Sequence, residues 1–198
     1  MKRKIVFATA NPGKLREAAE ILGENFEIVS AAAAGVPDDI PETGTTLQEN
    51  SLIKADHIWR KTGLDCFADD TGLEVDALGG APGIHTARYA GEGKDFNANI
   101  DKLLRELDRI PDASRTARFR TSVALVLGGE HFFFDGIMEG AIARGRHGHG
   151  GFGYDPVFQP EGCGGLTAAE ISEEEKNAIS HRGKALRAMA AFLNGRAE

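Results

Sequence analysis

The sequence predicts an α/β protein, because short apolar runs of strand type alternate with segments of helical periodicity. Residues 4–8 form an apolar run rich in β-forming side chains, and residues 12–22 repeat apolar side chains at helical spacing. The chain has 198 residues, of which 41% are hydrophobic and 27% charged, so it can bury a sizeable core. One domain, or two lobes that share one core, is expected.

The next segments continue this alternation of strands and helices. A second strand is expected at residues 26–29, and the small, acidic, Pro-containing stretch 31–44 is typical of a loop. Residues 46–61 carry apolar side chains and Lys54 at helical spacing, and Gly63 is a typical helix stop. A second helix is therefore predicted here.

The second half of the chain contains a further helix and a hairpin. Residues 95–107 place Ile and Leu on one helical face. Two longer strands are predicted at residues 117–127 and 131–143, with a turn at the Gly pair 128–129. Residues 145–156 are Gly-rich and are expected to form a loop.

The C-terminal part is predicted to be helical. The sequence TAAE at residues 167–170 fits a capping box, which usually precedes a helix. From Ser172 onward, Leu186, Met189 and Leu193 are spaced to face inward.

Composition excludes several classes of protein. The formal net charge of −7 argues against binding long nucleic acid through a general basic surface. Cys66 and Cys163 are too few and too distant for a disulfide framework or a zinc ribbon, and they suit a reduced cytoplasm. No stretch approaches the roughly 20 apolar residues that span a bilayer. A soluble, cytoplasmic protein with no membrane partner is expected.

The first candidate site is the loop between the first strand and helix. Free backbone N–H groups at a helix N-terminus favour phosphate, and a Lys at the same place adds a full positive charge. The GxxxxGK[ST] pattern of a Walker loop is absent, so a plain strand-to-helix turn with Pro at its first helical position stays an alternative. The candidate residues are Thr9, Ala10, Asn11, Pro12, Gly13 and Lys14.

The second candidate is a group of acids. Residues 66–68 form a brief apolar run before Asp69 and Asp70, so we expect these two carboxylates at the carboxyl end of a strand, where ligands collect in α/β folds. Magnesium prefers hard oxygen ligands and needs one or two protein carboxylates in addition to substrate phosphates. Asp70 could bind the metal, activate a water, or both, whereas its neighbour faces the other side of the strand. The acids of this group are Glu42, Asp69, Asp70, Glu74 and Asp76.

A structural alternative exists for the second candidate, because Asp70 and Thr71 would also suit an Asx turn before Gly72.

The third candidate is the Gly-rich segment 149–156, in which Phe152 or Tyr154 could stack on a base. Glycines also simply make turns, and an aromatic side chain among them is more often packed.

The fourth candidate is a basic group near the C-terminus. Lys176, His181 and Arg182 lie one to two helical turns apart in the predicted helix. Three such donors could hold a phosphate or a purine carbonyl. A solvated basic helix face is the usual explanation of such a run.

Five sequence blocks in this order resemble the inosine triphosphate pyrophosphatase family over nearly the whole chain. They are TANPGKLREAAEIL, ETGTTLQENSLIKA, FADDTGLEVDALGGAPGIHTARYAG, GGFGYDPVF and EEKNAISHRGKAL. The resemblance implies an α/β fold in which a mixed twisted sheet has flanking helices and two lobes surround a central nucleotide-binding cleft. It also implies that residues 1–198 form a single two-lobed domain and that the protein is a homodimer.

The resemblance further implies an activity. A Mg²⁺-dependent enzyme of this kind hydrolyses the non-standard purine nucleoside triphosphates ITP, dITP and XTP to the monophosphate and pyrophosphate, which removes them from the nucleotide pool. Two alternatives stay open. One is a pyrophosphatase for other modified nucleotides, and the other is a regulatory module that binds a nucleotide without cleaving it.

The resemblance also assigns roles by position. Residues 9–14 look like the phosphate-binding loop, Asp70 like the proton acceptor and a magnesium ligand, and Glu42 like an acid near the metal. Two residues depart from the family pattern: Ala10 stands where Gly is common, and Pro41 replaces an acid found in some relatives. The remaining substrate contacts would be Thr71, Phe152, Gly153, Tyr154, Asp155, Lys176, His181 and Arg182.

Overall fold

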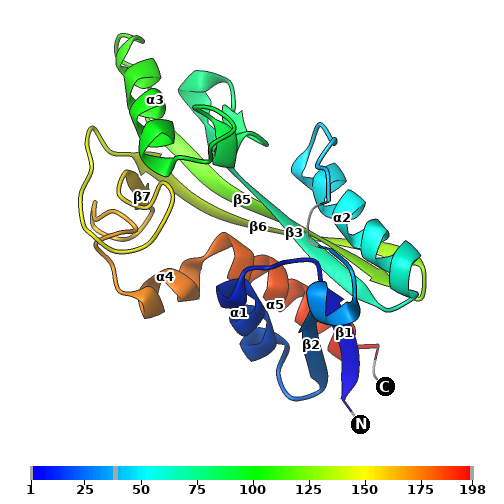
Figure 1. The fold of residues 1–198 in the computed structure, drawn as a ribbon. Helices are drawn as coiled ribbons and strands as arrows, with labels where there is room; N and C mark the ends of the chain where they lie inside the picture. Colours follow the sequence, from blue (N-terminus) through cyan, green and yellow to red (C-terminus); the bar gives the residue numbers. More distant parts are fainter. Residues whose placement is uncertain (1, 38–39, 197–198) are drawn as a thin grey trace. The chain divides into compact units, whose positions relative to one another are not determined.

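The computed structural model describes residues 2–37 and 40–196, which divide into two compact units. Unit 1 comprises Met1–Asp70, Thr121–Gly136 and Arg182–Glu198, and unit 2 comprises Thr71–Arg120 and Ile137–His181. Figure 1 shows the helices and strands of the chain coloured along the sequence.

The helices and strands of unit 1 begin close to their predicted positions. Strand β1 spans Arg3–Phe7, helix α1 spans Pro12–Leu22 and strand β2 spans Phe26–Ser30. Helix α2, Leu47–Thr62, starts at the Thr46 cap and ends at Gly63 in the left-handed conformation. The predicted loop 31–44 contains a short 3-10 helix, Ala32–Ala34, and its residues 38–39 lie outside the described residues.

The sheet is mixed, which confirms the predicted α/β class with flanking helices. Its strand order is β2-β1-β3-β5-β6-β7, with β4 paired to β3. Strand β1 runs parallel to both β2 and β3, whereas β3 pairs antiparallel with β4 and β6 pairs antiparallel with β7. The long strands are β3 (Cys66–Val75), β5 (Thr116–Leu127) and β6 (Glu130–Ile142), and the short ones are β4 (Pro82–Gly83) and β7 (Phe158–Pro160).

Alternation along β1 explains how the helices of unit 1 cover both faces of its strands. Ile5 and Phe7 belong to a core that includes Leu22 of α1 and Leu186 of α5, the C-terminal helix at His181–Asn194. Val6 points to the other face and packs in a second core with residues of α2. Successive side chains of one strand thereby bring α1 and α2 to opposite faces of the same sheet.

Unit 2 has its own core, built on helix α3 (Phe96–Asp108). Ile100, Leu103 and Leu107 of α3 pack with Leu73 of β3 and Phe158 of β7. The spacing of these three helical residues is the pattern that predicted the helix. Helix α4, Glu173–Ile179, also belongs to this unit.

Two local predictions were wrong. Asp69 and Asp70 do not follow a strand but lie inside β3, because β3 continues past its pairing with β1 at Phe67 and pairs onward with β4 at Leu73 and Glu74. The Asx turn proposed as an alternative for Asp70 is excluded for the same reason.

The second error concerns residues 167–170. Glu170 Oε2 accepts hydrogen bonds from the N–H and the hydroxyl of Thr167, but the Glu170 N–H donates to the Thr167 backbone carbonyl, so the box is incomplete and no helix starts there. The N–H groups of Ala168 and Ala169 instead donate to the carbonyls of Phe158 and Asp155. The helix begins after Ser172, whose own capping box with Glu175 is complete. None of the helices in the described part of the chain is long and apolar enough to cross a membrane.

Candidate functional site

The loop at residues 9–14 is held by its own side chains. Asn11 caps α1, since its Oδ1 accepts hydrogen bonds from the N–H groups of Gly13 at 2.8 Å and Lys14 at 3.3 Å. The Asn11 N–H donates to Thr9 Oγ1 at 3.2 Å, and Pro12 occupies the first helical position. Two of the N–H groups expected to be free for phosphate are therefore bonded within the loop. What this loop offers an anion most directly is the Lys14 ammonium group.

Asp69 joins this loop to α5 through two cations of unit 1. Its side chain is 2% exposed, and both of its oxygens accept hydrogen bonds from Lys14 Nζ at 2.8 Å. Arg182 Nε donates to Asp69 Oδ2 at 3.0 Å, and Arg182 Nη1 donates to Glu17 at 3.2 Å. Burial alone would raise the pKa of Asp69, but the charges of Lys14 and Arg182 outweigh it and hold that pKa below its usual range.

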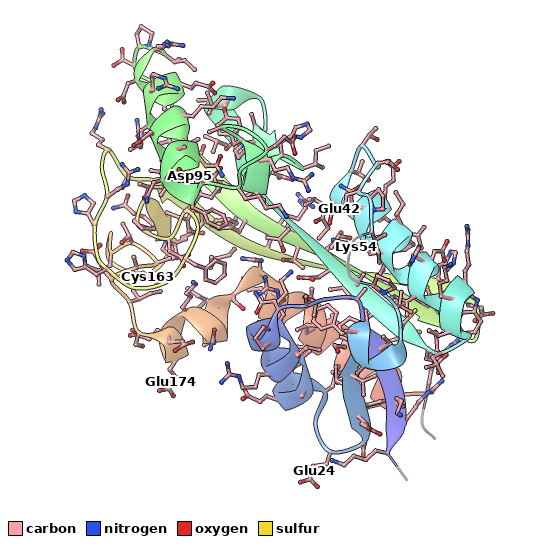
Figure 2. The ribbon with its side chains drawn as sticks, viewed as in Figure 1. Glu24, Glu42, Lys54, Asp95, Cys163 and Glu174 are labelled. Carbon is pink, nitrogen blue, oxygen red and sulfur yellow. The ribbon has the colours of Figure 1, made fainter. Side chains whose placement is uncertain are left out.

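Asp70 has different surroundings, although it is the next residue in β3. Lys54 Nζ lies 3.4 Å from Asp70 Oδ1 and donates to Glu42 Oε1 at 2.7 Å. Figure 2 labels Lys54 and Glu42. Burial raises the pKa of Asp70 above its ordinary value, while Lys54 partly opposes the shift and Glu42 adds to it. The two adjacent carboxylates thus have different partners, as expected for successive side chains of one strand.

Glu42 and Asp70 are the carboxylates on which a metal would depend. Their oxygens already share one cation, the Lys54 ammonium group, so a second cation would find hard oxygen donors here. Magnesium needs few protein ligands when substrate phosphates complete its coordination, and this donor set fits it. Among residues 2–37 and 40–196, no group of three or more His, Cys, Asp or Glu side chains is placed to hold a metal ion.

The predicted base segment, residues 152–155, is organised by Asp155 in unit 2. Asp155 Oδ2 accepts hydrogen bonds from the Phe152 N–H at 2.7 Å and from Lys176 Nζ at 2.5 Å. The same Lys176 ammonium lies 4.7 Å from the centre of the Phe152 ring. Gly153 has a φ of 63°, which glycine adopts without strain.

The two aromatic side chains of this segment differ in exposure. The Phe152 side chain is 66% exposed, so its ring is available to stack on a base. Tyr154 is 2% exposed and packs in the core of unit 2, where its hydroxyl donates to the Thr86 carbonyl at 2.9 Å. Of the two rings considered for stacking, Phe152 is the one at the surface.

Lys176, His181 and Arg182 do not share one helix, which corrects the expectation of a continuous basic face. Lys176 lies in α4, whereas His181 and Arg182 begin α5, and Ser180 between the helices is extended with φ −61° and ψ 142°. His181 stacks on Phe119 with ring centroids 5.1 Å apart. Thr71 directly follows Asp70 in β3.

Sequence reasoning did not select Lys54 as a site residue. Its side chain is mostly buried, and it contacts both carboxylates proposed to hold the metal. A signal was present, because Lys54 falls among the inward-facing positions of the predicted helix 46–61. A Lys at such a position is seldom buried without an anionic partner.

Comparison with known proteins agrees with this reading of the chain. The model of the Ham1 family matches residues 5–192. The dITP/XTP pyrophosphatase of Porphyromonas gingivalis is 52% identical over 190 residues, which cover 96% of this chain and 97% of that protein. The corresponding enzyme of Flavobacterium psychrophilum is 48% identical over 190 residues, 96% of this chain and 98% of that protein.

Solved structures give the same result. A HAM1 protein from Coxiella burnetii superposes with a TM-score of 0.92 at 41% identity, covering 98% of this chain and 99% of that chain. The Ham1 protein of Staphylococcus aureus gives a TM-score of 0.91 at 38% identity, covering 98% of this chain and 100% of that chain. The resemblance predicted from the five sequence blocks is confirmed, and the chain belongs to the Ham1 family.

Proposed function

We propose that this chain hydrolyses the non-standard purine nucleoside triphosphates ITP, dITP and XTP to the monophosphate and pyrophosphate, and so removes them from the nucleotide pool. Relatives named dITP/XTP pyrophosphatase, about half identical over nearly the full length, support the reaction and its substrate class. Within the molecule, the main support for the proposal comes from Asp70. The pKa of this carboxylate is raised, and Lys54 contacts both it and a second acid, Glu42.

Asp70 acts as the general base of this reaction. A carboxylate whose pKa is raised by burial accepts a proton more readily than an exposed one. As the oxygen of a water attacks phosphorus, its proton passes to an Asp70 Oδ, and the P–O bond between the α- and β-phosphates breaks to release pyrophosphate. Lys54 keeps the carboxylates of Asp70 and Glu42 in place.

Magnesium is the cofactor that we propose for Asp70 and Glu42. When bound, it neutralises charge that develops on the phosphates. Lys14 and Arg182 hold the triphosphate, and Asp69 orients both of these cations before the substrate arrives. The loop beside Lys14 is formed by Thr9, Ala10, Asn11, Pro12 and Gly13. Thr71 directly follows Asp70, the proposed general base.

The segment 152–155 of unit 2 recognises the purine. Phe152 stacks on the ring, Gly153 and the buried Tyr154 set the course of the backbone, and Asp155 fixes Lys176. Lys176 and His181 supply donors for the 6-keto oxygen. A donor aimed at that oxygen would meet the amino group of adenine instead, and an unpaired buried donor is costly.

We further propose that both units make up one pyrophosphatase domain over residues 1–198, that the protein works as a homodimer, and that it is cytoplasmic. Its partners are then a purine nucleoside triphosphate and a second copy of the chain, with no long nucleic acid and no membrane. The acidic net charge of −7 supports the exclusion of nucleic acid.

A substrate panel tests the proposed function. The protein is incubated with ITP, XTP, dUTP and the standard nucleoside triphosphates in the presence of Mg²⁺, and pyrophosphate release is measured. We expect fast turnover of ITP and XTP and slow turnover of the others. Equal rates on all substrates would favour a broad pyrophosphatase for modified nucleotides, and binding without product release would identify a regulatory module.

A further inference from the structure

We propose that the first turn of α3 positions the segment 152–155, with Phe96 and Arg146 as positioning residues for purine binding. This inference rests on the base-binding role proposed above for that segment. All the residues concerned belong to unit 2. Neither Phe96 nor Arg146 lies in any of the motifs that pointed to the nucleotide site.

Phe96 is a large apolar side chain at the start of α3 that stays 41% exposed. A polar residue would serve the first helical position at least as well, so the ring needs a reason to be there. Its edge lies against Gly153: a Cβ placed on Gly153 would be 3.6 Å from Cε1 and 3.7 Å from Cδ1 of Phe96. The ring therefore packs on the backbone directly after Phe152.

Arg146 makes a second contact between the Gly-rich loop and the same helix turn. Its Nη2 donates to the Asn97 carbonyl at 3.0 Å and to Asp101 Oδ1 at 2.8 Å. Arg146 lies near the start of the loop and Gly153 near its end. The beginning of α3 thus contacts both ends of the Gly-rich loop 145–156, which carries Phe152.

The helix turn is itself firmly held, which a positioning platform requires. Asp95 caps α3 through hydrogen bonds from the Asn97 and Ala98 N–H groups, and Figure 2 labels Asp95 at this end of the helix. Asn99, fully buried, donates to the Ala87 carbonyl at 3.0 Å and accepts from the Ala90 N–H at 2.6 Å. The first turn of α3 is therefore tied to the chain at residues 86–90.

This arrangement predicts which kinetic constant depends on Phe96. Gly153 follows Phe152, whose N–H is bonded to Asp155, so loss of the Phe96 ring loosens the segment that stacks on the base. Contacts to the base are made equally in the ground state and the transition state, so their loss raises KM and leaves kcat nearly unchanged. A residue that only stabilised the fold would not produce this split.

Steady-state kinetics with ITP compare Phe96→Ala with Ile110→Ala, which truncates a similarly exposed apolar residue just beyond the other end of α3. We expect Phe96→Ala to raise KM about five- to tenfold with kcat within about twofold. Phe96→Tyr keeps the ring and should restore KM. Inhibition by IMP should weaken in parallel, whereas inhibition by pyrophosphate should not change. Arg146→Ala should have a smaller effect of the same kind, with Arg105→Ala as its control.

Limited trypsin digestion provides a readout independent of activity. Arg144 is exposed directly before the Gly-rich loop 145–156, and cleavage after it should be at least about threefold faster in Phe96→Ala than in Ile110→Ala. Equal KM values and equal cleavage in all variants would overturn the positioning role while ITP turnover by the wild type upheld the proposed function. A wild type that does not hydrolyse ITP would overturn the function, and the proteolysis would still judge the role of Phe96. If Phe96→Ala lost kcat and melting temperature in parallel, Phe96 would only stabilise the fold and would have no positioning role.

Discussion

Asp69 and Asp70 share a strand, yet their surroundings push their pKa values in opposite directions. Asp69 is paired with Lys14 and Arg182, and these cations hold its pKa low. Burial raises the pKa of Asp70, whose cationic partner Lys54 is more distant and is shared with Glu42. One acid is therefore suited to remain a fixed anion and the other to take up a proton.

The substitution Asp70→Asn tests the second role. We expect the variant to keep the fold and to lose at least about a hundredfold in turnover of ITP, because an amide cannot accept the proton. Circular dichroism and pyrophosphate release are the measurements. Glu74→Gln is the matched control, since Glu74 lies in the same strand and pairs with Arg120 at 3.2 Å. Near-wild-type turnover by Asp70→Asn would mean that another group is the base.

Asp69→Asn should instead cost stability. It leaves Lys14 and the mostly buried Arg182 without their shared carboxylate, which we expect to lower the free energy of unfolding by about 3–5 kcal/mol. Because the folded pKa of Asp69 is depressed, its stabilisation is complete above the unfolded pKa of about 4 and is lost as the pH falls toward the folded value.

Urea unfolding of both proteins between about pH 7 and pH 3 checks this expectation. The wild-type advantage should be constant at the upper end of that range and shrink below about pH 4. An advantage that does not change with pH would show that the Asp69 carboxylate is not what stabilises this part of unit 1.

At the scale of single elements, caps decide where the helices begin. Helix α4 has seven residues, too few to be stable by propensity alone, and its start is fixed by the reciprocal bonds between Ser172 and Glu175. This cap matters for the site because α4 carries Lys176, whose ammonium group is bonded to Asp155.

Ser172→Ala should therefore lower the free energy of unfolding by about 1 kcal/mol, since it removes the acceptor for the Glu175 N–H. Thermal or urea unfolding measures the loss. Ser172→Thr keeps a hydroxyl acceptor and should stay within about 0.5 kcal/mol of the wild type. If both variants lost the same amount, the hydroxyl would not be the stabilising group.

Elements with strong local signals were predictable from the sequence. The helix predicted over residues 46–61 and its stop at Gly63 agree with the bounds of α2, and the Gly pair 128–129 joins β5 to β6 as expected. The errors occur where tertiary contacts override the local pattern. Residues 167–170 resemble a helix start, but the N–H groups of Ala168 and Ala169 bond to distant carbonyls, which no local pattern records.

The same distinction applies to the candidate site. The residue types and their order pointed to the acids and the Lys14 loop as candidates, because binding of a metal and of phosphate needs carboxylates and cations in any fold. The pairings could not be read from the sequence, because the partners are far apart in the chain. Arg182 meets Asp69 across 113 positions, and Lys54 meets Asp70 across 16.

At the scale of the whole molecule, charge constrains how an acidic protein binds a polyphosphate. The chain carries a net charge of −7, and the cations proposed to hold phosphate in unit 1 are already paired. Lys14, Lys54 and Arg182 face four carboxylates, so this group has no surplus positive charge of its own. The carboxylates are Glu17, Glu42, Asp69 and Asp70.

We therefore expect a triphosphate with about four negative charges to need a divalent cation for productive binding at such a site. Free Mg²⁺ should bind the protein weakly, because Lys54 already compensates Glu42 and Asp70, and most of the metal should arrive with the nucleotide. We expect EDTA to abolish ITP turnover, with full recovery on addition of Mg²⁺, while the melting temperature without nucleotide stays within about 1 °C.

Differential scanning calorimetry, with and without EDTA, and calorimetric titration of Mg²⁺ into the protein alone measure the two parts of this expectation. A large drop in melting temperature on chelation would reveal a structural metal bound before the substrate. Turnover that persists in EDTA would remove magnesium from the mechanism and leave Lys54 as the cation next to Asp70. In that case Lys54→Met, which keeps the length of the side chain without its charge, should abolish the remaining activity.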